Sequence, residues 1–226
     1  MFPGIRACVF DAYGTLFDTS SAAERLRSRL DDRADALSAA WRTKQLEYTW
    51  LMSLMGRHVD FMAVTSWALD FALEETGITA DAQLRADLMD QYRVLDAYPD
   101  ARGTLETLKK AGIATAILSN GSPEMLRSAT VTARIGTLLD YVLSVESVGI
   151  FKPHPRVYQL AVERLGVVRR EICFISSNGW DVAGAACFGF PVLWVNRTGK
   201  TAERLPTGPS ATRPDLTSLP ELIGLG

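Results

Sequence analysis

The sequence predicts an α/β fold, in which a doubly wound parallel sheet is interrupted by an inserted helical segment. Three observations predict it. Five short apolar runs rich in strand formers recur along the chain, and helical stretches lie between the later ones. Between residues 18 and 97 the strand pattern disappears and helical periodicity replaces it. Strands that alternate with helices form parallel sheets with right-handed crossovers.

The five apolar runs have the length and composition of buried parallel strands. They span residues 5–10, 113–118, 141–145, 172–176 and 191–195. The helices expected between them span residues 101–111, 123–133, 155–165 and 182–188. Residues 201–214 are rich in Pro, Thr and Gly and are expected to form loops, and a brief helix is expected over residues 219–223.

The inserted segment has the pattern of helices that each bury one side. One stripe at three-to-four spacing contains Leu37, Trp41, Lys44, Tyr48, Leu51 and Met55, and a second contains Phe61, Val64, Ala68 and Phe71. Most of these residues are expected to pack against the core. Upstream of them, Ser21 and Glu24 stand three residues apart, as in a capping box.

Composition and charge argue against several classes of protein. Apolar residues make up 47% and charged residues 22% of the chain, as in a soluble globular protein. The net charge of −2 gives no electrostatic basis for binding nucleic acid. No apolar run approaches the roughly 20 residues that span a bilayer. The N-terminus lacks the pattern of a signal peptide, which favours a cytoplasmic location.

Cysteine and histidine are not expected to form the reactive site. The three cysteines are an odd number at wide spacing, which argues against a disulfide framework. The two histidines lie in polar contexts without the spacing of metal ligands.

Polar segments follow the predicted strands at the edge where a parallel sheet binds its ligands. They are residues 11–15, residues 119–122, the stretch around Lys152, and residues 176–181. Each segment alone is also typical of a turn, a helix cap or a surface lysine. Because four of them converge on one edge, we expect an active site there.

These segments, in this order, resemble the haloacid dehalogenase superfamily, and most of all its L-2-haloacid dehalogenases (type II), over nearly the whole chain. In that superfamily a nucleophilic Asp follows the first strand, a Ser or Thr follows the second, and a Lys and an acidic segment complete the site. The residues at these positions are Asp11, Ser119, Lys152 and Asp181. The resemblance to the dehalogenases themselves is carried by residues 41–51, 151–158 and 176–181.

The resemblance implies two domains. Residues 1–17 and 98–226 are expected to form a Rossmann-like core, and residues 18–97 an inserted helical cap.

The residue two positions after the nucleophile separates a dehalogenase from a phosphatase of this superfamily. Phosphatases carry a second Asp there to protonate a leaving alkoxide, and such general acid catalysis contributes about 10²–10⁴-fold. This chain has Tyr13 instead. A halide ion is a weak base and leaves without a proton, so a tyrosine is compatible with dehalogenation and unfavourable for phosphoryl transfer.

The acidic segment also argues against a metal. Mg²⁺ prefers oxygen ligands, and phosphatases of this fold hold it with several carboxylates. Here Ser176, Ser177 and Asn178 precede the single Asp181. We expect neither a metal ion nor another cofactor.

By resemblance, the chain hydrolyses short-chain (S)-2-haloacids, a class extended here to haloacetates and fluoroacetate, to 2-hydroxy acids. Asp11 attacks the halogen-bearing carbon and forms an ester, which water then cleaves. Asn178 and Asp181 position and activate that water. Lys152 lies between Asp11 and Asp181 and keeps both ionised.

Further residues take supporting roles in the same resemblance. The hydrogen-bond shell of the carboxylates is expected from Thr15, Tyr158 and Ser176. Arg42 of the cap stabilises the departing halide with its permanent charge. Asn120 and Trp180 complete the halide cradle with an amide donor and the positive edge of an aromatic ring.

The substrate carboxylate is expected to bind Ser119 and the backbone amides of Tyr13 and Asn120, and Phe61 is expected to line the apolar pocket. The expected partners are therefore a 2-haloacid substrate and a halide product, with no nucleic acid and no membrane. Relatives in the family are often homodimers, which implies a homodimer here, and apolar residues of the cap could form its interface.

Three rival functions remain open at this point. One is a hydrolase of the same fold that acts on another small carboxylic acid, such as a strained-ring amino acid, through Asp11. Another is a Mg²⁺-dependent small-molecule phosphatase, against which Tyr13 argues. The last is a catalytically inactive binding protein, against which the intact set of Asp11, Lys152 and Asp181 argues.

Overall fold

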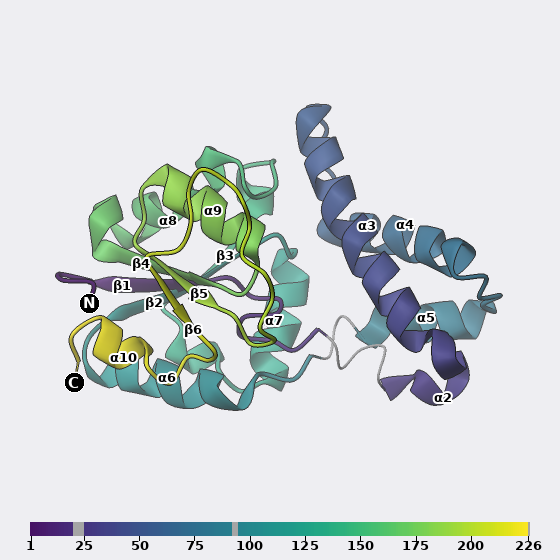
Figure 1. The fold of residues 1–226 in the computed structure, drawn as a ribbon, viewed down its shortest axis with the longest axis horizontal. Coiled ribbons are helices and arrows are strands. Elements are labelled where there is room, and N and C mark those ends of the chain that lie inside the picture. Colours follow the sequence, from purple (N-terminus) through teal and green to yellow (C-terminus); the bar gives the residue numbers. More distant parts are fainter. Residues whose placement is uncertain (20–24, 92–94, 226) are drawn as a thin grey trace.

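A six-stranded parallel sheet forms the centre of the computed structural model, which describes residues 1–19, 25–91 and 95–225 (Figure 1). Its strands are β1 (Ala7–Phe10), β2 (Ala114–Ser119), β3 (Tyr141–Ser144), β4 (Ile172–Ser176), β5 (Val192–Val195) and β6 (Ala211–Arg213). They lie in the order β3-β2-β1-β4-β5-β6. This is the order of a doubly wound sheet, so the predicted fold class is confirmed.

The central strands of the sheet are buried because both of their faces are largely apolar. Every residue of β1, β4 and β5 is buried, as expected for strands covered by helices on both sides. Phe10, the last residue of β1, pairs with Ile117 of β2 and Ile175 of β4. The residues that follow these three strands therefore emerge close together, at the point where the strand order reverses.

Helices cover both faces of the sheet. They are α6 (Pro99–Lys110), α7 (Pro123–Thr132), α8 (Pro155–Leu165), α9 (Gly179–Phe188) and α10 (Leu219–Leu222). In Figure 1, α8 and α9 lie above the sheet, and α6 and α10 lie below it. The first three begin with a proline, whose fixed φ and missing N–H suit the first helical position. Single-turn 3₁₀ helices occur at η1 (Asp31–Arg33), η2 (Gly136–Leu138), η3 (Val145–Ser147) and η4 (Arg169–Glu171).

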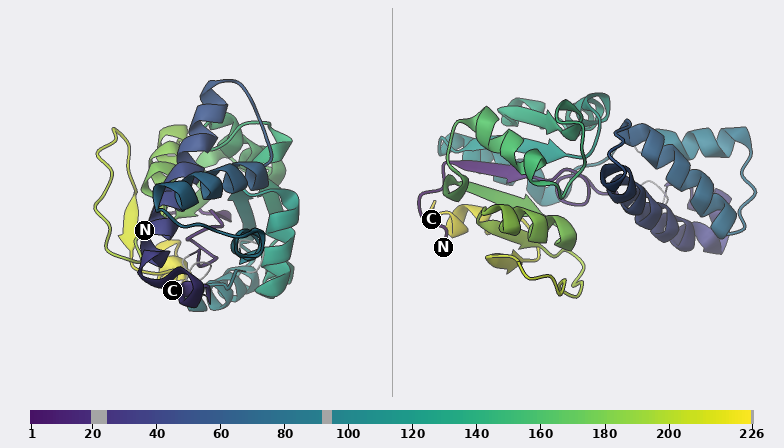
Figure 2. Two further views of the ribbon diagram at one scale, coloured as in Figure 1. Left: turned by 90° about the vertical axis from the view of Figure 1, so that its right-hand side faces the viewer. Right: turned by 90° about the horizontal axis from the view of Figure 1, so that it is seen from above.

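The inserted helices lie to one side of the sheet, beyond the end at which β1 leads into its loop (Figure 2). They are α2 (Arg27–Leu30), α3 (Ala34–Leu54), α4 (Phe61–Glu75) and α5 (Ala82–Gln91). The long helices α3 and α4 pack together, and the indole N–H of Trp41 donates to the backbone oxygen of Thr65 at 2.8 Å. The predicted capping pair Ser21 and Glu24 lies outside the described residues.

The predicted stripe on α3 is only partly right. Leu37 and Trp41 are buried, but Leu51 and Met55 are 48% and 61% exposed. The buried face of the helix instead continues through Gln45, one turn after Trp41. Beyond that point the end of α3 extends past α4 in Figure 1, so none of the described helices of the insert covers its last turn.

The second stripe is better matched. Phe61, Val64 and Ala68 of α4 are buried. Phe71 is half-buried, and the Lys44 ammonium lies 4.5 Å from the centre of its ring.

The prediction of loops throughout residues 201–214 was wrong, because residues 211–213 form β6 and pair in parallel with β5. A three-residue edge strand is too short to show an alternating pattern, and its backbone pairing is fixed only by the neighbouring strand. The final short helix, α10, forms where it was expected. Helix α9 begins at Gly179, three residues before the expected start, so Trp180 and Asp181 lie in its first turn.

None of the described helices has both the length and the apolar character that crossing a membrane requires.

Candidate functional site

The Lys152 ammonium lies between two carboxylates at the carboxyl edge of the sheet. Its Nζ is 3.1 Å from Asp11 Oδ1 and 2.8 Å from Asp181 Oδ2. Asp11 follows β1, Asp181 lies in the first turn of α9, and Lys152 lies in the loop before α8. All three side chains are buried, with Lys152 only 1% exposed. The sequence prediction that Lys152 stands between the carboxylates agrees with this geometry.

Burial and mutual attraction act in opposite directions on these groups. Burial alone would lower the pKa of Lys152, but the charges of Asp11 and Asp181 outweigh it and raise that pKa. Burial and the nearby Asp11 charge raise the pKa of Asp181, while Lys152 and Tyr158 act to lower it. The ammonium is therefore firmly protonated, and Asp181 is a stronger base than an exposed aspartate.

Tyr158 supports Asp181 from the other side. Its hydroxyl donates to Asp181 Oδ1 at 2.7 Å. Burial and the Asp181 charge raise the pKa of Tyr158 well above its usual value, so the hydroxyl keeps the proton that it donates. The ring packs edge-on against Phe174, and the Lys152 ammonium lies 5.0 Å from the centre of the Phe174 ring.

The second oxygen of Asp11 is surrounded by neutral donors. Asn178 Nδ2 donates to Asp11 Oδ2 at 2.7 Å, and the hydroxyls of Thr15 and Ser176 lie at 3.4 and 3.5 Å. The same hydroxyls accept from the loop after β4: Ser177 N–H donates to Thr15 Oγ1, and Asn178 N–H donates to Ser176 Oγ. These bonds fix the orientation of the Asp11 carboxylate, with one oxygen on Lys152 and the other on Asn178.

The segment after β2 reaches the site through the backbone of Lys152. Asn120 Oδ1 accepts from Lys152 N–H at 3.0 Å, which fixes the orientation of the side-chain amide, so that its Nδ2 points away from the Lys152 backbone. Ser119 Oγ accepts from Gly121 N–H at 3.1 Å and keeps its own hydrogen to donate. Both side chains are buried.

Arg42 extends from α3 to the sheet edge and joins the two parts of the chain. Its Nη2 lies 3.4 Å from Asn178 Oδ1, and its Nη1 donates to Gln45 Oε1 at 2.7 Å. Gln45 Nε2 in turn donates to Thr65 Oγ1 at 2.7 Å, and Thr65 Oγ1 donates to Phe61 O. The amide of Gln45 is thereby held with its oxygen towards the guanidinium.

Sequence reasoning missed Gln45 and Thr65. Both are completely buried. The available signal was the position of Gln45 one turn after Trp41, because a polar residue inside a buried stripe needs a buried partner.

Two of the predicted aromatic residues, Phe61 and Trp180, pack against different partners. Phe61 is buried and stacks on Tyr13 with ring centres 5.9 Å apart. Trp180 is not joined to the carboxylates by a hydrogen bond between described residues. Its ring instead packs at a steep angle against the ring of Trp50, with ring centres 5.6 Å apart, and its buried Nε1 has no acceptor among the described residues.

The structure thus joins most of the predicted residues in one connected site, with Trp180 beside it. The hydrogen-bonded members are Asp11, Tyr13, Thr15, Arg42, Asn120, Lys152, Tyr158, Ser176, Asn178 and Asp181. Among the described residues, no three His, Cys, Asp or Glu side chains are grouped as metal ligands.

Comparison with known proteins gives consistent results. A profile of the haloacid dehalogenase-like hydrolases matches residues 5–189. The chain is 48% identical to (S)-2-haloacid dehalogenase 1 of Pseudomonas sp. (strain CBS-3), over 97% of this chain and 96% of that protein. It is also 48% identical to (S)-2-haloacid dehalogenase 4A of Burkholderia cepacia, over 90% and 88%.

Solved structures are similarly close. A dehalogenase with an intermediate complex superimposes with a TM-score of 0.96 at 44% identity, over 99% of each chain. The L-2-haloacid dehalogenase from Xanthobacter autotrophicus with chloropropionic acid covalently bound superimposes with a TM-score of 0.90 at 39% identity, over 96% of this chain and 98% of that one.

Removing the buried ammonium tests how far the carboxylates depend on it. Lys152→Met keeps most of the stem but leaves Asp181 without its cation, so we expect the free energy of unfolding to fall by about 3–5 kcal/mol near neutral pH. When folding raises the pKa of a carboxyl, the free energy of unfolding decreases as the pH rises, because the unfolded chain ionises that carboxyl more readily. We expect the pKa of Asp181 to rise further without Lys152. The difference in free energy of unfolding between the parent and Lys152→Met should therefore be smaller at about pH 5 than at about pH 8.

Urea denaturation of the variant and the parent at both pH values measures this loss. Lys110→Met, at an exposed lysine of α6, is the matched control. A loss of equal size at both pH values would show that the charge of Asp181 does not depend on Lys152.

Proposed function

The chain belongs to the haloacid dehalogenase-like hydrolases, and within them to the (S)-2-haloacid dehalogenases, and we propose that it hydrolyses short-chain (S)-2-haloacids to 2-hydroxy acids through an ester of Asp11. One observation carries the proposal. A buried carboxylate is held by an ammonium on one oxygen and by an amide on the other, and the residue two positions later is a tyrosine rather than an acid.

In the first step, an oxygen of Asp11 forms a bond to C2 of the substrate as the carbon–halogen bond breaks. The halide leaves with the bonding electron pair and needs no proton. Arg42 is suited to receive it, because its recorded partners among the described residues are the neutral amide oxygens of Gln45 and Asn178. The guanidinium charge is therefore left for an anion. We propose that Asn120 Nδ2 and Trp180 complete the halide cradle.

In the second step, water attacks Cγ of the Asp11 ester, and the bond breaks between Cγ and the former Asp11 oxygen that is now bonded to C2. The 2-hydroxy acid leaves, and one oxygen of the restored Asp11 carboxylate comes from the water. We propose Asp181 as the base that takes the water's proton, since its raised pKa favours proton acceptance. The proton then passes to the departing alkoxide. Asn178 and Lys152 stabilise the charge that develops on the ester oxygens.

The substrate carboxylate is assigned to the end of β2 and the residue that follows it. Ser119 retains a hydroxyl hydrogen to donate, and the backbone amides of Tyr13 and Asn120 supply further donors. The rings of Phe61 and Tyr13 form an apolar wall for the short side chain of the substrate.

The site supports metal-independent chemistry rather than phosphate hydrolysis. Tyr13 cannot replace the general acid that an alkoxide leaving group needs. After β4, Ser176, Ser177 and Asn178 precede the single Asp181, so few carboxylates are present to hold Mg²⁺. We therefore propose that the reaction uses no metal ion and no other cofactor.

We further propose that residues 18–97 act as a cap domain over a core of residues 1–17 and 98–226. Arg42 and Phe61 come from the first part, whereas the carboxylates and Lys152 come from the second.

Halide release tests the proposed function. We expect chloride release from (S)-2-chloropropionate that persists in excess chelator and falls by about 10³-fold or more in Asp11→Ala, because the bond-forming group is gone. Asp32→Ala, at an exposed aspartate of η1, is the control and keeps the parent rate. Chelator-sensitive phosphate release without halide release would instead assign the site to a phosphatase. Ring opening without halide release would assign it to another small carboxylic acid.

We also propose a homodimer formed through the apolar end of α3. There Leu51, Leu54 and Met55 are 48%, 85% and 61% exposed, and clustered apolar exposure is typical of an interface. We expect sedimentation to give the mass of two chains for the parent and of one chain for Leu54→Glu. Leu205→Glu, at a leucine that is 51% exposed outside the inserted helices, is expected to leave the dimer intact. A parent that sediments as one chain would contradict the proposal.

A further inference from the structure

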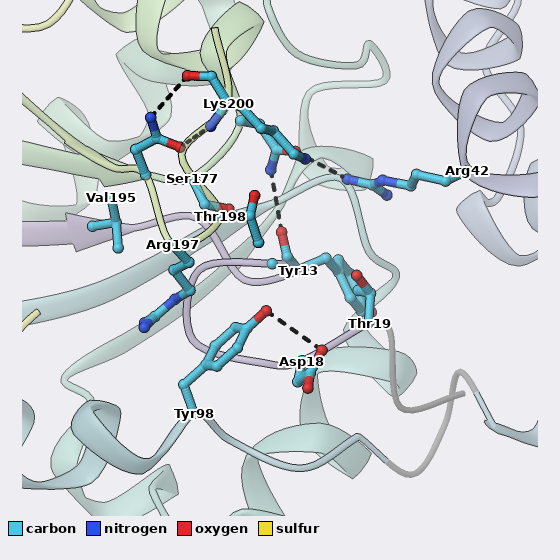
Figure 3. Close-up of a pocket in the computed structure, with 13 residues that line it drawn as sticks. Tyr13, Asp18, Thr19, Arg42, Tyr98, Ser177, Val195, Arg197, Thr198 and Lys200 are labelled. Carbon is cyan, nitrogen blue, oxygen red and sulfur yellow. Dashed lines mark hydrogen bonds between the residues drawn. The ribbon is translucent and has the colours of Figure 1, made fainter. Parts of the chain in front are cut away.

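A cavity of about 210 Å³ lies beside the carboxylates and is lined by both parts of the chain (Figure 3). Arg42, Tyr13 and Asn178 of the proposed site form its inner wall. Neither Asp11 nor Lys152 lines it. The cavity is therefore a separate space that meets the reaction centre at the residues around Asp11.

The contact between Arg42 and Asn178 forms the boundary between the two spaces. Asn178 faces Asp11 with its Nδ2, at 2.7 Å, and Arg42 with its Oδ1, at 3.4 Å. The bond to Arg42 is long, and its guanidinium is half-buried on a helix of the insert. Asn178 therefore contacts both the nucleophile and the cavity wall.

The outer rim of the cavity is formed by the loop after β5. Thr198 and Lys200 line it and are exposed. The side chain of Asn196 holds this loop closed: its Nδ2 donates to Lys200 O at 2.9 Å, and its Oδ1 accepts from Lys200 N–H at 2.8 Å. The backbone that carries the Lys200 ammonium is thus fixed relative to the sheet.

The charge of the cavity favours an anion. Lys200 at the rim forms no ion pair with a described residue, and Arg42 at the inner wall has only neutral amide partners among them. Arg197 also lines the cavity, but its charge is balanced by two hydrogen bonds to Asp100. Asp18 also lines the cavity and opposes these cations, so Arg42, Lys200 and Asp18 together leave one net positive formal charge on the wall. A path with a cation at each end, in a chain of net charge −2, attracts monoanions more than the surface around it does.

We propose that this cavity is the vestibule through which 2-haloacid anions reach Asp11 and through which the halide leaves. Lys200 attracts the carboxylate at the rim, and Arg42 takes over the anion at the inner wall. This role rests on the proposed function for its substrate. It adds two specificity-determining positions, Lys200 for charge and Thr198 for width.

The first experiment reverses the charge at the rim. In Lys200→Glu we expect kcat/KM for (S)-2-chloropropionate to fall about three- to fivefold at low ionic strength and to return towards the parent value in a concentrated halide-free salt. Arg204→Glu makes the same charge change at an exposed arginine of the same loop that does not line the cavity, and we expect less than half the effect. Equal losses in the two variants would overturn the proposal.

The second experiment narrows the cavity. In Thr198→Trp we expect kcat/KM to fall more for 2-chlorobutyrate than for chloroacetate, because the longer acid needs the wider path. Thr201→Trp, at an exposed threonine outside the cavity, is the matched control and leaves the ratio of the two substrates unchanged. An unchanged ratio in Thr198→Trp would overturn the proposal.

The affinity for propionate, an unreactive monoanion, separates the vestibule from the proposed function. It is measured by calorimetry on the parent, Lys200→Glu and Arg204→Glu. If the parent releases no halide, the proposed function fails, and weaker propionate binding specific to Lys200→Glu still supports an anion path. If the parent releases halide but the two variants bind propionate equally well, the vestibule fails alone.

Discussion

The rest of the structure depends on one buried ammonium shared by two buried carboxylates. Burying any of the three charges alone is costly, and each is tolerated because the other two are present. Lys152 meets Asp11 at 3.1 Å and Asp181 at 2.8 Å only because β1 and β4 are neighbours in the sheet. The doubly wound strand order therefore brings together side chains that are 141 and 29 residues apart along the chain.

The inserted helices add what the sheet edge lacks. The sheet edge provides two buried carboxylates and their shared ammonium, whereas α3 provides a cation, Arg42, that has no carboxylate partner among the described residues. The direction of Arg42 depends on Gln45, which is fixed by Thr65 on the neighbouring helix. Packing within the insert thus positions a guanidinium that contacts Asn178 beside Asp11 and also lines the cavity.

Local patterns predicted the sheet and its helices well because each element carries its own signal. Helix α8 begins and ends where expected, with Pro155 at its start and Gly166 after its end. Convergence of the polar strand ends followed from topology alone, whereas the individual roles came from family resemblance. β6 could not be predicted, since its pairing depends on β5, and the position of Gln45 in a buried stripe could indicate a buried partner but not that the partner is Thr65 of another helix. Periodicity does not reveal such partners.

The fate of solvent oxygen in a single turnover tests the central claim most directly. With enzyme in excess over (S)-2-chloropropionate in water labelled with heavy oxygen, an ester of Asp11 requires the label to appear in the Asp11 carboxylate and not in the lactate produced. Mass spectrometry of the peptide that contains Asp11 and of the product measures both. Label found in the product, with an unlabelled Asp11, would show that water attacks the substrate directly and would contradict the account.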